Sequence, residues 1–233
     1  MATRNRYYNI EGTIRSGFKL SRDYETLDFS FIKMNDDGVR ALVGSRSIKQ
    51  LKRLTINNNK LTQESGLAIA ESKWLENLQS LKLYRNKIGH EGLKALAGSD
   101  KLPSLKSLRL AHNQIGPEGA KFVAESKNFG GLTSLGLSEN NLGDEGIKYL
   151  AEAQNLKGLE ILDLRSNNIT DDGAIAFSTC TNFPNIQKVE LSDNKLTDVG
   201  EKSMKSFLIH NLIHKGVKVS DEGMICDLSN LGI

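Results

Sequence analysis

The sequence contains 233 residues, of which 25% are charged and 38% hydrophobic, and its formal net charge is +3. This composition is typical of a folded, soluble protein, and so small a net charge does not by itself indicate a nucleic-acid or membrane partner. Residues 1–10 lack the apolar core of a Sec-type signal peptide, and no stretch approaches the ~20 apolar residues of a membrane-spanning helix.

Residues 1–23 precede the repeated part of the chain and are predicted to form an N-terminal cap. Residues 8–14 alternate weakly between polar and apolar types, and Phe18 and Leu20 are apolar. A solenoid has to cover the open core of its first repeat, because a terminal repeat has a neighbour on one side only. We therefore expect this segment to shield the first repeat.

Residues 24–212 repeat one pattern seven times at intervals of 27 residues. Six copies follow the form LxxLxLxxNxI or a close variant, a looser one begins at Tyr24, and the six begin at Leu51, Leu78, Leu105, Leu132, Leu159 and Ile186. A fixed period of this length is the signature of a solenoid built from one repeated unit. The unbroken period predicts one continuous, elongated domain.

Each position of the repeat has a predicted role. The LxL pair alternates with period two, which predicts a short strand with both apolar side chains on one face and, after stacking, a parallel sheet. The ninth position carries an amide that is expected to be buried and to bond backbone groups of neighbouring repeats as a ladder, through Asn59, Asn86, Asn113, Asn140, Asn167 and Asn194. Ile32 replaces this amide in the first repeat.

A helix is predicted after each turn, with acidic residues in its first turn and a threonine or glycine at the N-cap, namely Thr62, Gly89, Gly116, Gly143, Thr170 and Thr197. A small residue then recurs in one register: Gly38, Ser65, Gly92, Gly119, Gly146, Gly173 and Gly200. Because a helical glycine costs roughly 1 kcal/mol relative to alanine, close packing between neighbouring helices is the expected reason.

Residues 213–233 are predicted to form a truncated eighth repeat and a C-terminal cap. Residues 216–219 resemble a strand and residues 220–223 a helix start, but Gly223 follows Gly200 by 23 residues instead of 27. Ile225 and Leu228 are expected to close the core at this end.

The extended pattern LxxLxLxxNxIxxEGxxxLA resembles the ribonuclease-inhibitor-like class of leucine-rich repeats over residues 24–227. The resemblance implies an α/β fold: a curved solenoid with a parallel β-sheet on the concave side and helices on the convex side. Repeats of this class are often a residue or two longer than 27, which separates this chain from the ribonuclease inhibitors proper. Function has to be argued from the surface, because one fold serves many functions.

The third, fifth, seventh and eighth residues of each repeat are expected to face solvent on the concave side. Basic residues gather in the second to fourth repeats and acidic ones in the sixth and seventh, with Gly136 leaving a gap between them. The predicted partner-binding residues are Arg53, Asn57, Asn58, Lys82, Tyr84, Arg85, Arg109, His112, Asp163, Arg165, Glu190 and Asp193. Arg and Tyr are enriched at interface hot spots. The alternative is that mixed charge only keeps an exposed sheet soluble.

Other patterns do not predict a catalytic or metal site. The Asp-rich helix starts, such as residues 36–38 and 171–173, lack the remaining ligands of an EF-hand, and His210 and His214 lack a third ligand. No GxSxG sequence, phosphate-binding loop or Cys–His pair occurs. We therefore expect no metal and no cofactor.

We predict a non-catalytic scaffold that binds another protein on its concave face, as an inhibitor or as a bacterial effector or effector regulator. The alternative is GTPase activation of the Ran-activator type, although the chain has fewer repeats than that family and no acidic tail. The predicted partner is a protein, not a nucleic acid or a membrane, and the chain alone is expected to be a monomer. The thiols of Cys180 and Cys226 are expected to be free, which favours the cytoplasm; delivery into a host cell stays open.

Overall fold

The fold comes from a computed structural model, which describes residues 9–214 and the side chains of residues 9–211. Seven parallel strands form one open sheet in chain order. They are β1 (Thr26–Asp28), β2 (Arg53–Thr55), β3 (Ser80–Lys82), β4 (Ser107–Arg109), β5 (Ser134–Gly136), β6 (Ile161–Asp163) and β7 (Lys188–Glu190). Each strand pairs with the next in a register shifted by one 27-residue period, so Leu27 lies opposite Leu54 and Leu54 opposite Leu81.

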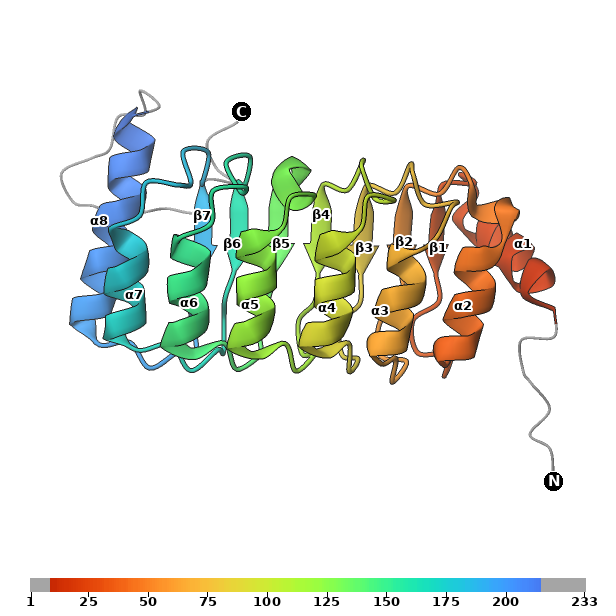
Figure 1. Cartoon of the computed structure of the whole chain (residues 1–233), viewed down its shortest axis with the longest axis horizontal. Helices are drawn as coiled ribbons and strands as arrows, with labels where there is room; N and C mark the ends of the chain where they lie inside the picture. Colours follow the sequence, from red (N-terminus) through yellow and green to blue (C-terminus); the bar gives the residue numbers. More distant parts are fainter. Residues whose placement is uncertain (1–8, 215–233) are drawn as a thin grey trace.

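A helix precedes the first strand and one follows every strand. They are α1 (Ile10–Ser21), α2 (Asp36–Gly44), α3 (Gln63–Ala70), α4 (Gly89–Gly98), α5 (Gly116–Glu125), α6 (Gly143–Ala151), α7 (Asp171–Ser178) and α8 (Asp198–His214), with short 3₁₀ turns at Arg46–Ile48 and Phe129–Gly131. Figure 1 shows α2 to α8 in one row across a single face of the sheet. The predicted α/β solenoid, with strands on one side and helices on the other, is confirmed.

The core lies between the inner face of the sheet and the helices. Leu54 and Ile56 of the second repeat are fully buried, as are the equivalent LxL residues of the third to sixth repeats. Val189 and Leu191 of the seventh repeat are only partly buried. Among the described residues no strand follows β7, so this coil lacks the neighbour that covers the others.

The asparagine ladder is present as predicted. The side-chain nitrogen of Asn113 donates to the carbonyl oxygens of Leu83, Leu110 and Ala111 at 2.8, 3.0 and 3.0 Å, and its oxygen accepts from the amide of Ile88 at 3.2 Å. Asn113 is fully buried. The amide therefore ties its own turn to the preceding repeat.

The junctions between helices differ from the simple N-caps that the sequence predicts. Helices α4, α5 and α6 begin at Gly89, Gly116 and Gly143 themselves, with φ of 64°, 65° and 60°, a left-handed conformation that favours glycine. At the threonine junctions a carboxylate of the preceding helix binds the cap residue. Asp36 accepts from the amide and the hydroxyl of Thr62 at 2.9 and 2.8 Å. The same contacts join Asp144 to Thr170 and Asp171 to Thr197.

Close packing on two sides explains the recurring glycine. A Cβ atom at Gly92 would lie 2.6 Å from Cγ2 of Ile88 in its own repeat and 3.1 Å from the Cα of Gln63 in the preceding helix. One at Gly146 would lie 2.9 Å from Cβ of Leu142 and 3.3 Å from the Cα of Pro117. Ser65, the exception, is buried and donates its hydroxyl to Asp36. A small side chain therefore fits at this position when its hydroxyl finds an acceptor.

The two ends of the solenoid differ. Helix α1 packs Ile14 and Phe18 into the core, and a Cβ at Gly17 would lie 2.6 Å from Leu27. The strand and helix start predicted over residues 216–223, the closing residues Ile225 and Leu228, and Cys226 lie outside the described residues. The predicted domain boundaries remain predictions.

Candidate functional site

The concave face at β2 to β4 carries the predicted basic cluster, but its members differ in whether they bind other side chains of the protein. Arg53 is committed to the N-terminal segment, because its Nη2 lies 2.6 Å from Asp23 Oδ2 and its Nε donates to Thr26 Oγ1 at 2.8 Å. Lys82 and Arg85 are exposed, and neither forms an ion pair or side-chain hydrogen bond within residues 9–214. These two side chains are the free cations of the cluster.

Tyr84 lies between the free cations in sequence and is half-buried. Its backbone N–H donates to Asn57 Oδ1 at 2.8 Å, so Asn57 fixes the tyrosine backbone and its amide oxygen is already occupied. Asn58 is half-buried and has a φ of 52°. Of these three half-buried residues, Tyr84 has the largest side chain.

Gly136 is not the bare gap that the sequence predicts. It is buried, and a Cβ atom at this position would lie 2.9 Å from Arg109 Cδ. Arg109 therefore lies across the glycine, and its Nη2 donates to Ser134 Oγ at 3.4 Å. The expectation failed because a long arginine side chain in one repeat can cover a glycine in the next.

In the sixth and seventh repeats, Asp163 and Glu190 are paired with basic side chains of the same face. Asp163, expected to be open to solvent, is only 4% exposed. Its carboxylate accepts from Arg165 Nε and Nη2 at 2.9 and 2.8 Å, and from Ser138 Oγ at 3.3 Å. Arg165 also lies 3.1 Å from Glu190, which in turn lies 2.7 Å from Lys188. The predicted gradient from basic to acidic is therefore wrong for Asp163 and Glu190, which are ion-paired, whereas Asp193 is exposed and forms no ion pair within residues 9–214.

These contacts shift the titration of the pair. Burial raises the pKa of Asp163, but hydrogen bonds from Arg165 and their mutual attraction lower it, and the net pKa lies below its ordinary value. Hydrogen bonding to Asp163 raises the pKa of Arg165. The pair is therefore charged at neutral pH and serves structure more than recognition.

The eighth residue of each repeat forms a second row of candidates, all in the left-handed conformation. His112 faces Glu139 across one strand spacing, with Nδ1 and Oε2 3.2 Å apart. Asp193 is exposed at the C-terminal end of the row. Phe31, at the other end, is 67% exposed and was not among the predicted site residues. Its position in the repeat places it on this face, but its burial could not be judged from the pattern.

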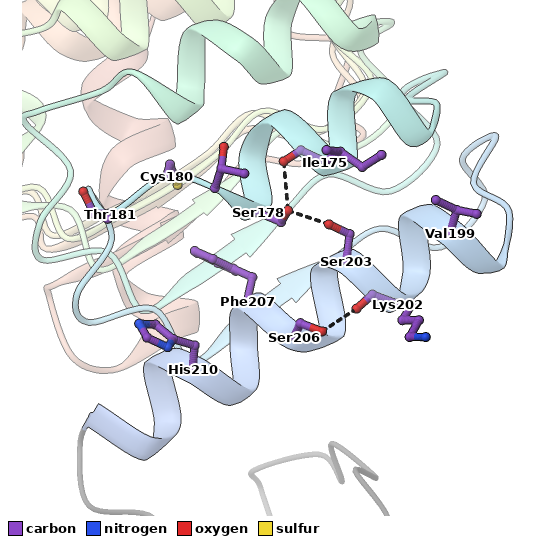
Figure 2. A pocket seen from close by; sticks show the side chains of 11 residues that line it. Ile175, Ser178, Cys180, Thr181, Val199, Lys202, Ser203, Ser206, Phe207 and His210 are labelled. Atoms are coloured by element: carbon purple, nitrogen blue, oxygen red, sulfur yellow. Dashed lines mark hydrogen bonds between the residues drawn. The ribbon is translucent and has the colours of Figure 1, made fainter.

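A groove on the opposite, helical face lies between α7 and α8 and has a volume of about 720 Å³. Figure 2 shows Phe207 projecting from α8 toward α7, with Ile175 and Val199 farther along the groove. Ser178 and Ser203 bond each other at 2.6 Å, and burial raises the pKa of the Cys180 thiol, which disfavours its thiolate. No group of three or more His, Cys, Asp or Glu side chains that could hold a metal occurs within residues 9–214.

A family model described as "Leucine Rich repeat" matches five segments, residues 75–97, 101–124, 132–151, 158–178 and 184–204. This chain is a leucine-rich repeat protein. Proteins of this family generally mediate protein–protein interactions. A comparison with curated proteins finds no match. The predicted membership in the ribonuclease-inhibitor-like class stays a prediction.

Solved structures of other proteins resemble this one. InlP of Listeria monocytogenes has a TM-score of 0.51 and 17% identity, over 74% of this chain and 44% of InlP. An internalin, InlF, of the same species has a TM-score of 0.48 and 21% identity, over 77% and 45% of the two chains. The tropomodulin C-terminal domain of Caenorhabditis elegans has a TM-score of 0.43 and 12% identity, over 89% and 96%. The first of these similarities shows the fold alone, and this leucine-rich repeat protein spans less than half the length of either Listeria chain.

None of the helices in residues 9–214 combines the length and the apolar character that crossing a membrane would require.

Proposed function

We propose that this leucine-rich repeat protein is a non-catalytic scaffold that binds a partner protein on its concave face. Contact is centred on the basic patch, defined here as Lys82, Tyr84, Arg85 and Arg109. The observation that carries the proposal is that Lys82 and Arg85 remain exposed without an internal partner, whereas the charges around Asp163 are paired. Unpaired charges on an ordered sheet are available to a partner.

The rigidity of this sheet favours binding. The patch residues project from successive strands held by the ladder, so little backbone order has to be gained on association, which lowers its entropic cost. Tyr84 combines a large ring with a hydroxyl that can stay hydrogen-bonded at an interface. The partner would be inhibited or sequestered by the contact, inside the cytoplasm of the producing cell or, for a bacterial effector, of a host cell.

The test begins with a partner captured from the native cell and identified by mass spectrometry. Tyr84→Ala should then raise the Kd at least about 30-fold if this ring is a hot spot. Arg85→Glu should mainly slow association, and more strongly at low salt, because it reverses a steering charge. The matched control is Lys148→Glu on α6, an exposed cation that also lacks an ion pair within residues 9–214.

The outcome that contradicts this assignment is a loss of affinity in Lys148→Glu with no loss in the concave variants. The site would then lie on the helical face. A single-turnover GTP hydrolysis assay with candidate GTPases tests the Ran-activator alternative. We expect no acceleration, because the Asn57 side-chain oxygen, one of the few groups available for that role, already accepts from Tyr84.

A further inference from the structure

The N-terminal end of the concave face exposes apolar side chains. Seven large hydrophobic residues are exposed within the described chain, and four of them, Leu20, Tyr24, Phe31 and Ile32, lie between residues 20 and 32. Phe31 and Ile32 occupy the eighth and ninth positions of the first repeat, next to the concave strands. Phe31 and Ile32 are adjacent, and neighbouring exposed apolar residues mark a contact surface more often than isolated ones do.

Phe31 is unfavourable where it stands unless a partner covers it. Its φ is 61°, a conformation that costs roughly 1–2 kcal/mol for residues other than glycine, asparagine and aspartate. Its side chain is also 67% exposed, so the ring gains little from burial in the core. Asn58 is a residue type suited to this conformation, and it occupies the equivalent position one repeat later. Because the eighth residue of every repeat is left-handed, the feature that sets Phe31 apart is its large exposed ring, which points to contact with a partner.

Phe31 lies within reach of the free cations. Its N–H donates to Asn57 O at 3.0 Å, and Asn58 N–H donates to Tyr84 O at 2.8 Å, so backbone bonds connect the first, second and third repeats. Phe31 and Arg85 share the eighth position and are separated by two strand spacings, about 10 Å. In the row formed by the fifth residue of each repeat, the carboxylate nearest to Lys82 is that of Asp28. Thr55 lies between them, so Asp28 and Lys82 are about 10 Å apart, which is beyond ion-pair distance.

We propose that the segment captured on this face is an extended, acidic stretch of the partner protein, with an apolar residue that packs on Phe31. This inference rests on the proposed function and specifies the chemistry of the partner. Carboxylates of the segment contact Lys82 and Arg85, which have no acidic neighbour of their own. In the polyproline II conformation an extended chain rises about 3.1 Å per residue with three residues per turn, so residues three positions apart lie on one side of the segment about 9 Å apart, which matches the span of about 10 Å between Phe31 and Arg85.

A protein segment fits this surface better than a single-stranded nucleic acid. Stacking on Phe31 and Tyr84 is available to bases as well, but nucleic-acid grooves follow the backbone with many cations. Here Arg53 is paired with Asp23 and Arg109 lies across Gly136, which leaves two free cations on the patch.

The experiment pans a random dodecapeptide phage library against the immobilised full chain, so that no peptide chemistry is assumed in advance. Enriched peptides are synthesised with a fluorescein label, and their Kd is measured by fluorescence polarisation. The labelled oligonucleotide U12 is measured in parallel. The variants are Phe31→Asn, which removes the ring but suits the left-handed backbone, Lys82→Gln and Arg85→Gln, with Lys148→Gln as the control.

We expect enrichment of Asp or Glu with an apolar residue three positions away. Each of the three concave variants should weaken the enriched peptide about tenfold or more, the control should leave it unchanged, and U12 should bind more weakly than the peptide. Absence of enrichment, enrichment of neutral or basic peptides, or tighter binding of U12 overturns the inference. If non-acidic peptides are enriched and Tyr84→Ala abolishes their binding, only the acidic chemistry is wrong. If binding is indifferent to Tyr84→Ala and to every concave variant, the proposed function fails as well.

Discussion

Replacing Asn113 with leucine tests the ladder on which the concave face is built. The side chain makes three donor contacts, but each carbonyl keeps a second donor after the change. Leu83 O still accepts from Asn86, Leu110 O from Asn140, and Ala111 O from the amide of Arg85. The amide of Ile88 instead loses the Asn113 oxygen, which is the acceptor that the structure gives it.

The expected cost follows from that difference. One buried amide without a partner costs about 1–3 kcal/mol, whereas the carbonyls that keep a bond add little. Asn113→Leu should therefore lower the free energy of unfolding by about 1–3 kcal/mol, measured by urea denaturation followed by circular dichroism. Asn185→Leu is the control, because Asn185 is exposed and makes a single bond to Lys157 O at 2.8 Å; it should change stability by no more than about 0.5 kcal/mol. Equal stability of Asn113→Leu and the wild type would refute the reasoning.

Two further predictions concern packing and charge. Gly119→Ala should lower the free energy of unfolding by about 1–3 kcal/mol in urea melts, because the added Cβ would clash with Cγ2 of the buried Ile115. Gly98→Ala is the control: the space around Gly98 is open, so this change should be neutral or stabilising by up to about 1 kcal/mol. Equal effects of the two changes would contradict the close-packing argument. Asp163→Asn should cost roughly 1–3 kcal/mol at pH 7. Because the folded pKa of Asp163 is depressed, its stabilisation exists above the unfolded value of about 3.9 and is lost as pH falls through the folded pKa. The two proteins should therefore converge below about pH 4, and a difference that grows with acid would exclude this role.

The sequence predicts the fold well because every repeat carries the same information. The LxL pair gives the strand and its buried face, the ninth residue gives the ladder, and the 27-residue period gives the register of the sheet. Because the pattern occurs seven times, a residue that departs from it in one repeat is recognisable by comparison with the other repeats. Ile32 is recognisable as an exception for this reason, although the pattern does not reveal its 41% exposure.

The site was harder to predict because it depends on side-chain contacts, both within a repeat and between repeats, that the repeated pattern does not specify. Asp163 and Arg165 look like independent surface charges in the sequence, yet they bond each other and leave Asp163 buried. Asp36 looks like a cap of its own helix, yet it binds Thr62 at the start of the next one. The left-handed conformation of the eighth residue also escaped prediction, since Phe31 and Arg85 are not residue types that favour it.

The repeat nevertheless contains a rule for which charges stay free. A charge on this face can be paired by the equivalent residue of a neighbouring strand about 4.8 Å away, by a residue two positions away on its own strand, or by a residue diagonally opposite on the next strand. In the eighth-position row, His112 meets Glu139. Lys82 instead lies between Thr55 and Arg109, and Arg85 is flanked by Asn58 and His112. Neither cation has an acidic residue at any of these positions, whereas Arg165 has Asp163 two positions before it and Glu190 diagonally opposite on the next strand. We therefore expect a partner to bind where the charges of adjacent repeats leave each other unpaired.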